Sequence, residues 1–190
     1  MLERTQLLTN IQKHIVLEPL EIEFLETIFS FRTYQKKSIL FNQDQICREF
    51  YFVEYGSIRA FNVNENGKSA TIMFAIKDWW VTDIYCFTNQ KPALLSLEAL
   101  EETKVAVLSY DNFQLLLNKF PKFNRFFRIL FQNAYSREQL RVLDSISLTT
   151  EERFQKFLDK YPQIVEKLTQ KQIASYLGVT PEFLSSVKKK

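Results

Sequence analysis

Short alternating segments of apolar and polar residues between positions 31 and 109 constrain the fold more than any other feature of this chain. They are rich in Val, Ile, Phe and Tyr, the residues that β-strands favour. Turn-forming residues separate them at positions 42–44, 55–56, 64–67 and 77–78. Seven or eight short strands at this spacing predict an antiparallel sandwich or barrel.

A helical period returns after Tyr110. Residues 111–120 predict a short helix that ends at Pro121, and residues 121–146 predict a long helix without an internal breaker. The long helix carries apolar residues on more than one side, so it must be buried on more than one side. It could be a central helix beneath the sheet. We favour a helix that packs on its own barrel with one face and on a second copy of the chain with the other.

Two further helix starts follow the long helix. Thr149 is followed by acidic residues and predicts a helix that runs to about Tyr161. Thr169 and Gln172 then form a Thr-x-x-Gln capping box at the start of another helix. Gly178 provides the left-handed stop of that helix, as glycine commonly does.

The last predicted helix starts with Thr180 as its cap and Pro181 in its first turn. Ala174 is a small residue at the point where this helix would cross the preceding one closely. The inward-facing residues are expected to be Ile173, Leu177, Leu184 and Val187, with Phe183 beside the last two. This is the spacing of a helix-turn-helix whose second helix is free on its outer face. The alternative is a pair of packed helices without a nucleic-acid role.

Polar side chains on the outer face and at the helix starts are candidate DNA contacts. Glu can accept from the amino group of cytosine, and Ser can contact bases or phosphate. Helix N-termini and lysines attract phosphate groups. The candidate residues are Thr169, Gln170, Thr180, Pro181, Glu182, Ser185, Ser186, Lys188 and Lys189.

The charge distribution along the chain agrees with a DNA-binding site in the C-terminal segment. Residues 1–150 hold 17 basic and 17 acidic residues, whereas residues 151–190 hold 8 basic and 5 acidic ones, so the excess of +3 lies in the C-terminal segment. A basic segment suits a nucleic-acid partner, although a chance fluctuation of surface charge would look the same.

Other function classes are not supported by the sequence. The sequence contains no run of about 18 apolar residues, so it predicts no membrane span. Residues 1–15 are polar, whereas a signal peptide has an apolar core. We therefore expect a cytoplasmic protein. Cys47 and Cys86 lack a metal-binding spacing and are expected to be buried thiols. His14 is the single histidine, whereas a metal-dependent barrel enzyme needs several. We expect no enzyme, no metal and no cofactor.

Three segments carry a resemblance to a known family, namely 51-YFVEYGSIRAF-61, 98-EALEETKVAVLS-109 and 172-QIASYLGVTPEFLSSVKKK-190. With the order of barrel, long helix and helix-turn-helix, they resemble the CRP/FNR superfamily of bacterial transcription regulators, in particular its short Bacteroidetes-type members. The resemblance implies an α+β fold: an antiparallel jelly-roll sensor domain of the cyclic-nucleotide-binding type over residues 1–120, a dimerisation helix over 121–147 and a DNA-binding domain over 148–190.

The chain departs from the family in the region that would hold a cyclic nucleotide. Family members that bind one use a Gly-Glu pair and an Arg followed by a small hydroxyl residue. Residues 78–97 contain neither Gly nor Arg, and Asp83 and Lys91 stand near those positions. Lysine cannot reproduce the bidentate phosphate contact of arginine, so we expect no binding of cyclic AMP. The residues that would line a pocket for another small-molecule effector are Trp79, Trp80, Asp83, Tyr85 and Lys91; the aromatic ones could equally be core residues.

A second departure is Ser186, where the family usually has an arginine that contacts guanine. Serine cannot make that bidentate contact, so the target sequence should differ. The resemblance still implies a transcription regulator that binds double-stranded DNA as a homodimer at a two-fold-related promoter site, with RNA polymerase as a candidate partner and no membrane. The alternative is a ligand-sensing or protein-interaction module whose helix-turn-helix no longer reads DNA.

Overall fold

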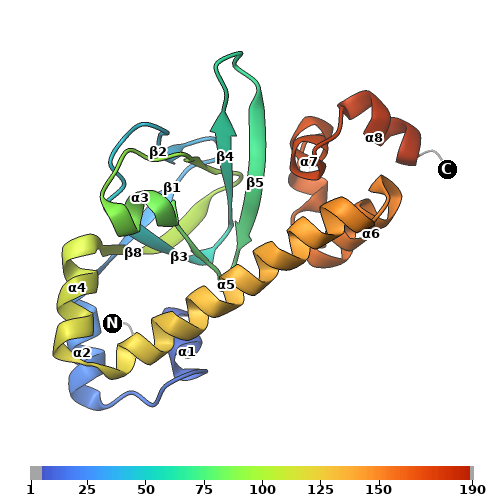
Figure 1. Cartoon of the computed structure of the whole chain (residues 1–190). Coiled ribbons are helices and arrows are strands. Elements are labelled where there is room, and N and C mark those ends of the chain that lie inside the picture. Colours follow the sequence, from blue (N-terminus) through green and yellow to red (C-terminus); the bar gives the residue numbers. More distant parts are fainter. Residues whose placement is uncertain (1–5, 189–190) are drawn as a thin grey trace.

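A computed structural model describes residues 6–188 and consists of a β-barrel, a helical layer at its base, one long helix and a C-terminal group of short helices (Figure 1). The strands are β1 (Phe29–Tyr34), β2 (Ile39–Phe41), β3 (Glu49–Tyr55), β4 (Ser57–Val63), β5 (Ser69–Ile76), β6 (Trp80–Val81), β7 (Ser96–Ala99) and β8 (Thr103–Ser109). The helices are α1 (Gln6–Gln12), α2 (Pro19–Ile28), α3 (Ile84–Asn89), α4 (Tyr110–Lys119), α5 (Lys122–Ser147), α6 (Thr150–Lys160), the 3-10 helix η1 (Val165–Lys167), α7 (Gln170–Leu177) and α8 (Pro181–Lys188).

The strands form two four-stranded antiparallel sheets, in the orders β1-β8-β3-β6 and β2-β7-β4-β5. Side chains alternate along each strand, so one face of each sheet lies inside the barrel. Ile58 and Ala60 of β4 point inward, where they belong to the same buried cluster as Tyr51, Val53 and Leu97. The predicted α+β fold with an antiparallel barrel is confirmed.

Gly56 makes the tight turn between β3 and β4 possible. Its φ is +88°, and a side-chain Cβ at this position would lie 2.5 Å from Thr103 Oγ1 and 2.6 Å from the carbonyl oxygen of Glu102. Neither the dihedral angle nor the space admits another residue.

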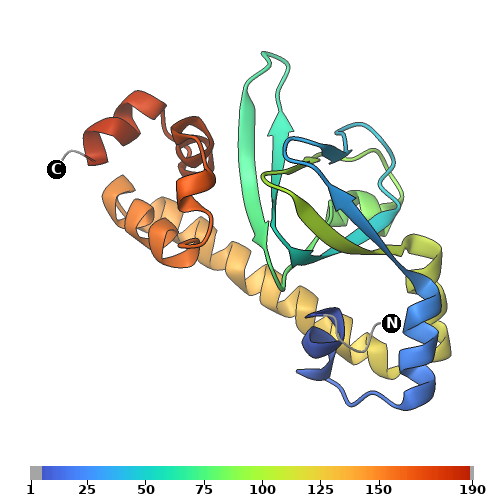
Figure 2. The ribbon, with the colours of Figure 1, turned by 180° about the vertical axis from the view of Figure 1, so that it is seen from behind.

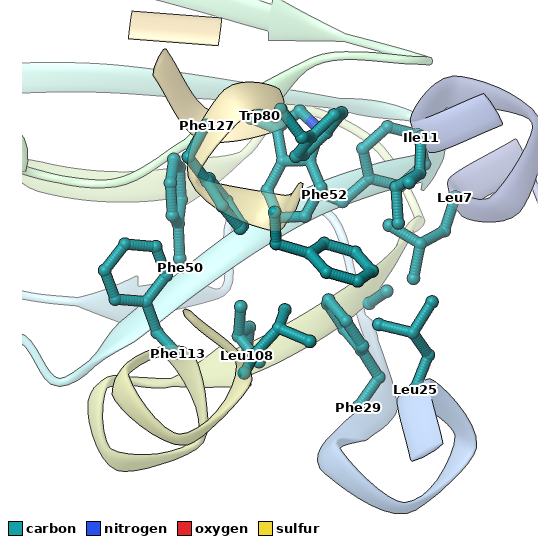
Figure 3. Packing of buried hydrophobic residues seen from close by; sticks show 14 of the residues in the cluster. Leu7, Ile11, Leu25, Phe29, Phe50, Phe52, Trp80, Leu108, Phe113 and Phe127 are labelled. Carbon is teal, nitrogen blue, oxygen red and sulfur yellow. The ribbon is translucent and has the colours of Figure 1, made fainter. Parts of the chain in front are cut away.

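An aromatic core joins the first sheet to the helical layer (Figure 3). Trp80 lies at its centre, with ring centroids 5.1 Å from Phe50, 5.3 Å from Phe52 and 5.7 Å from Phe127. Trp80 is 6% exposed. The high phenylalanine content of the chain is therefore explained largely by this layer.

Two α-helices were not predicted from the sequence. Helix α1 buries Leu7 and Ile11 in the aromatic core, and α3 is a single short helix in the segment interpreted above as a ligand pocket. The helical period of residues 18–29 predicts one apolar face that contains Leu20, Phe24, Leu25 and Ile28, and this prediction is partly wrong for α2. Leu20 is 64% exposed, whereas Glu21 is buried and pairs with Lys122 at 2.6 Å.

Helix α5 changes its surroundings along its length. Phe123, Phe126 and Phe127 in its first part are buried in the aromatic core. In its second part, Tyr135 is 66% exposed and Ile146 is 79% exposed. The reading of α5 as a helix beneath the sheet therefore holds for its first part alone.

A third buried cluster connects the barrel with the C-terminal helices. Phe74 of β5 and Leu100 contribute to it from the barrel, and Phe157, Tyr161 and Ile173 contribute from the helices. Helix α7 lies beside β5 in both views of the ribbon (Figures 1 and 2). The C-terminal helices thus pack on the outer face of the barrel through a shared core.

Candidate nucleic-acid interface

The three C-terminal α-helices begin at the caps that the sequence predicts. Thr149 Oγ1 accepts from the backbone N–H of Glu152, whose carboxylate accepts from Thr149 N–H at 2.8 Å. Thr169 and Gln172 form the same reciprocal pair at the start of α7. Thr180 Oγ1 accepts from the N–H of Phe183 at 3.2 Å. These contacts satisfy N–H groups that a helix start leaves unpaired.

The turn between α7 and α8 also has the predicted geometry. Gly178 adopts φ +71° and ends α7, and the N–H of Val179 donates to the carbonyl oxygen of Ala174 at 3.0 Å. Ala174 is fully buried, as expected for a close helix crossing. The remaining predicted inward residues, Ile173, Leu177, Leu184 and Val187, are all buried.

Gln170 connects the two helices. Its side-chain amide donates to the carbonyl oxygen of Pro181 at 2.9 Å and to Ser185 Oγ at 2.5 Å. Gln170, Pro181 and Ser185 are half-buried as a result. In this arrangement Gln170 fixes the position of α8, rather than presenting a free amide to solvent.

The outer face of α8 is exposed. Thr180, Glu182 and Ser186 are exposed, and so is Thr169 at the start of α7. The hydroxyl of Ser186 donates to the carbonyl oxygen of Phe183 at 2.7 Å. Among the predicted contacts, Lys188 is the last residue of α8, and Lys189 lies outside the described residues.

Sequence reasoning misplaced one residue on this face and missed another. Phe183, expected beside the inward pair, is 49% exposed on α8. Lys171 in the first turn of α7 is exposed and makes no ion pair among the described residues. The sequence could have indicated Lys171 as a DNA contact, because this lysine lies at a helix start directly after the candidate contacts Thr169 and Gln170.

The opposite side of α7 is fixed to the edge of the barrel. Ser175 Oγ accepts from the N–H of Thr71 at 2.8 Å and donates to the carbonyl oxygen of Ser69 at 2.9 Å. One serine thus pairs two backbone groups of the edge strand β5. Arg153 of α6 adds a hydrogen bond to the carbonyl oxygen of Leu177 at 2.9 Å. This docking leaves the polar face of α8 uncovered.

The five residues expected to line a ligand pocket are not brought together. Trp80 is a core residue, and Trp79 packs against the third cluster. The Asp83 carboxylate is buried and accepts from the N–H groups of Cys86, Leu94 and Leu95 at 2.6 to 3.0 Å, which is a cap for α3. Tyr85 and Lys91 are exposed. The core interpretation is therefore correct for Trp80, whereas Trp79 is only partly buried.

Both cysteines are buried and free, as predicted. The N–H of Cys47 donates to Cys86 Sγ at 2.7 Å. Burial raises the pKa of the Cys86 thiol to about 11 and also raises that of Cys47, so both stay protonated at neutral pH. His14 packs beside Phe126 at 5.9 Å between ring centroids. The described residues contain no group of side chains suited to a metal, and none of their helices has the length and apolar character of a membrane span.

Comparisons with known proteins agree with this architecture. Residues 31–120 match the family described as cyclic nucleotide-binding domain. FixK2 from Bradyrhizobium japonicum has a similar structure, with a TM-score of 0.73 at 17% identity over 85% of this chain and 83% of that one. A protein from Eubacterium rectale described as a transcriptional regulator of the CRP/FNR family has a TM-score of 0.73 at 15% identity, covering 91% of this chain and 82% of that one.

A similarity in sequence extends beyond the barrel. The anaerobic regulatory protein of Aggregatibacter actinomycetemcomitans is 24% identical over 162 residues, which cover 80% of this chain and 62% of that protein. The chain thus spans less than two thirds of the length of this relative. Such relatives are named as regulators and not as enzymes, in agreement with the expectation that this chain is not an enzyme. With its cyclic-nucleotide-binding-type barrel, long helix and helix-turn-helix, the chain is similar in sequence to these regulators and shares its fold with proteins described as CRP/FNR regulators.

Proposed function

We propose that this protein is a transcription regulator that binds a two-fold-related DNA site as a homodimer, with α8 as the recognition helix. The observation that carries the proposal is the exposed polar face of α8, with Glu182 and Ser186 outward while Leu184 and Val187 hold the helix in place. A recognition helix needs this combination of a fixed inner face and a free outer face.

The proposed contacts divide by what they can recognise. Glu182 can accept from a cytosine amino group, and the ring of Phe183 can pack against a thymine methyl group. Thr169, Thr180 and Lys171 surround the starts of α7 and α8, where hydroxyl, ammonium and free N–H groups suit phosphate. Base contacts would determine the sequence, and phosphate contacts would determine the register.

The exposed apolar side chains of α5 support the proposed homodimer. Tyr135, Val142 and Ile146 are 53 to 79% exposed and, with Gln139, are spaced by four, three and four residues. This spacing forms the contact stripe of a two-stranded coiled coil. A second α5 would bury the stripe and place two recognition helices at a fixed separation. Residues 1–120, 121–147 and 148–190 would then act as sensor, dimerisation and DNA-binding units.

Selection from random duplexes with the purified protein, followed by binding titrations at several salt concentrations, tests the proposal. We expect enrichment of two related half-sites about 10 base pairs apart between centres, or a multiple of that distance. Binding should weaken steeply with salt because phosphate contacts release counterions. No enriched site together with a shallow salt dependence would instead support a sensing or interaction module. The bonded hydroxyls of Ser185 and Ser186 are the observation that favours this second candidate.

We also propose that the barrel does not bind cyclic AMP. The N–H groups of Leu94 and Leu95 already donate to the buried Asp83 carboxylate, whose negative charge would repel a phosphate. The barrel interior is occupied by its own apolar cluster. A melting-temperature screen should show no shift with cyclic AMP, and a clear saturable increase would contradict this part of the proposal.

A further inference from the structure

A cleft of about 920 Å³ separates the barrel from the C-terminal helices. Its walls come from β5, the second part of α5, α6 and α7. These elements lie around one another in both views of the ribbon (Figures 1 and 2). Any molecule bound there would contact the barrel, the long helix and the helix-turn-helix at once.

The cleft is rich in positive charge, with five cationic side chains against two carboxylates. Two of the cations are neutralised within the protein. Lys156 pairs with Asp144 at 2.7 Å, and Arg141 pairs with Glu138 at 2.8 Å. The second carboxylate of the cleft, Asp159, makes no ion pair among the described residues.

The other three cations, Arg137, Arg153 and Lys160, have no carboxylate partner within the part of the chain that is described. The guanidinium of Arg137 lies 4.4 Å from the centre of the Trp79 ring, and the ammonium of Lys160 lies 5.7 Å from it. Arg153 donates two hydrogen bonds to oxygens of α6 and α7, and its Nε is buried without a partner. Within the described residues, three unpaired cations face one unpaired carboxylate, that of Asp159, so the cations outnumber it by two; their positive charges repel one another, and a bound anion would relieve that repulsion.

The pKa of Lys160 reflects the charges around it in the cleft. The pKa of this half-buried amine is lowered by its burial first and then by the positive charge of Arg137. Arg141 lowers it further, while the carboxylates of Glu138 and Asp144 act in the opposite direction. A bound anion would reverse the effect of the neighbouring charges and favour the protonated amine.

We propose that this cleft binds a small phosphorylated metabolite that carries at least two negative charges. Arg137 would contact a phosphate group through its planar guanidinium fork, and Lys160 would act as a point charge beside it. Because the cleft is built from both parts of the molecule, the ligand would hold the helix-turn-helix against β5. The inference concerns a site outside the barrel and does not depend on DNA binding.

Titration of the full chain with pyrophosphate and with adenosine diphosphate, without DNA and at constant ionic strength, tests the proposal. Calorimetry should show saturable binding of one ligand per chain, and the melting temperature should rise. Arg137→Gln should weaken binding by about tenfold or more, since it removes the bidentate donor. Arg125→Gln removes the same charge from an exposed position of α5 outside the cleft and should leave affinity unchanged.

The Asp159→Asn variant distinguishes an effect of charge on ligand binding from a loss of binding caused by misfolding. Removing this carboxylate from the cleft should tighten binding by about two- to fivefold, a gain that misfolding cannot produce. No saturable binding of either probe, or equal losses in the Arg137→Gln and Arg125→Gln proteins, would overturn the proposal.

A short DNA duplex distinguishes the two sources of phosphate. If neither probe binds while Arg137→Gln weakens duplex binding, the cleft contacts the DNA backbone and the proposal of a metabolite site is wrong. If a probe binds but no duplex does, the cleft proposal stands and the proposed function fails.

Discussion

The two parts of α5 are both rich in apolar residues, yet they have opposite surroundings. Phe123 and Phe127 in the first part are 1 to 3% exposed, because the barrel and the helical layer enclose them. Tyr135, Val142 and Ile146 in the second part are more than half exposed. The same kind of side chain is thus core in one part and surface in the other.

The difference shows that the apolar residues of a helix indicate which of its faces must be buried. They do not indicate whether the same chain or a second copy buries that face. In the first part, the cover comes from the chain itself. In the second part, the spacing of the exposed residues points to another α5. Substitutions in the first part of α5 should therefore reduce the stability of the fold, and substitutions in the second part should weaken dimer assembly.

Phe127→Ala should have the largest effect on stability. The side chain contacts the rings of Phe50, Trp80, Phe113 and Phe126, so its removal leaves a cavity in the aromatic core. Urea unfolding should show a loss of about 3 to 5 kcal/mol in the free energy of unfolding.

Phe183→Ala is the matched control for this prediction, because it makes the same change at a half-exposed ring outside the buried clusters. We expect a change within about 0.5 kcal/mol. Similar losses for both substitutions would show that α8 is packed differently from the structure described.

Val142→Glu should affect assembly and leave the fold of each chain intact. A charge on the exposed stripe would be buried without a partner in a dimer, so dimer affinity should fall by about a hundredfold or more. Sedimentation velocity over a concentration series measures this change. Asn133→Glu adds the same charge at an exposed α5 position off the stripe and should have little effect. If Val142→Glu leaves the association state unchanged, the stripe is not the dimer contact.

Helix α8 also has one buried face and one exposed face. The Glu182→Ala substitution tests whether the exposed face contacts DNA bases. Removal of one base-contacting side chain should cost about 1 to 3 kcal/mol of discrimination at a single base position. Stability should not change, because Glu182 is exposed. Repeated selection with the variant should show relaxed preference at one symmetric pair of positions. An unchanged sequence preference would exclude Glu182 as a base contact.

The sequence predicted the helix-turn-helix well because its signals are local. A capping box is completed three residues after Thr169, and the left-handed stop needs only Gly178. The strands were predicted for a similar reason, since alternation and turn residues act over a few positions. Such features need no knowledge of which distant elements meet.

The contacts that were not predicted involve residues whose surroundings depend on distant parts of the chain. Trp80 was interpreted as a possible pocket residue, but β3 and α5 enclose it. Asp83 was compared with a family position for phosphate, whereas it caps α3 and pairs with backbone groups eleven and twelve residues later. Gln170 was expected to face phosphate, and its amide also donates to Ser185 of α8, a contact that the local sequence does not indicate. In each case a polar or aromatic side chain had several possible partners, and only the tertiary structure selects one.

Lys171→Gln should have the smallest effect, and it separates phosphate contacts from base contacts. An exposed lysine that meets one phosphate adds the same attraction to every sequence, so its loss should weaken binding roughly uniformly, by about two- to tenfold. The slope of log affinity against log salt should decrease by about one per bound α7, because one fewer counterion is released. Lys104→Gln on the barrel, far from α8 in the chain and exposed, is the matched charge control. A loss of affinity confined to particular sequences would instead place Lys171 in a groove, and α7 would then share the reading of bases with α8.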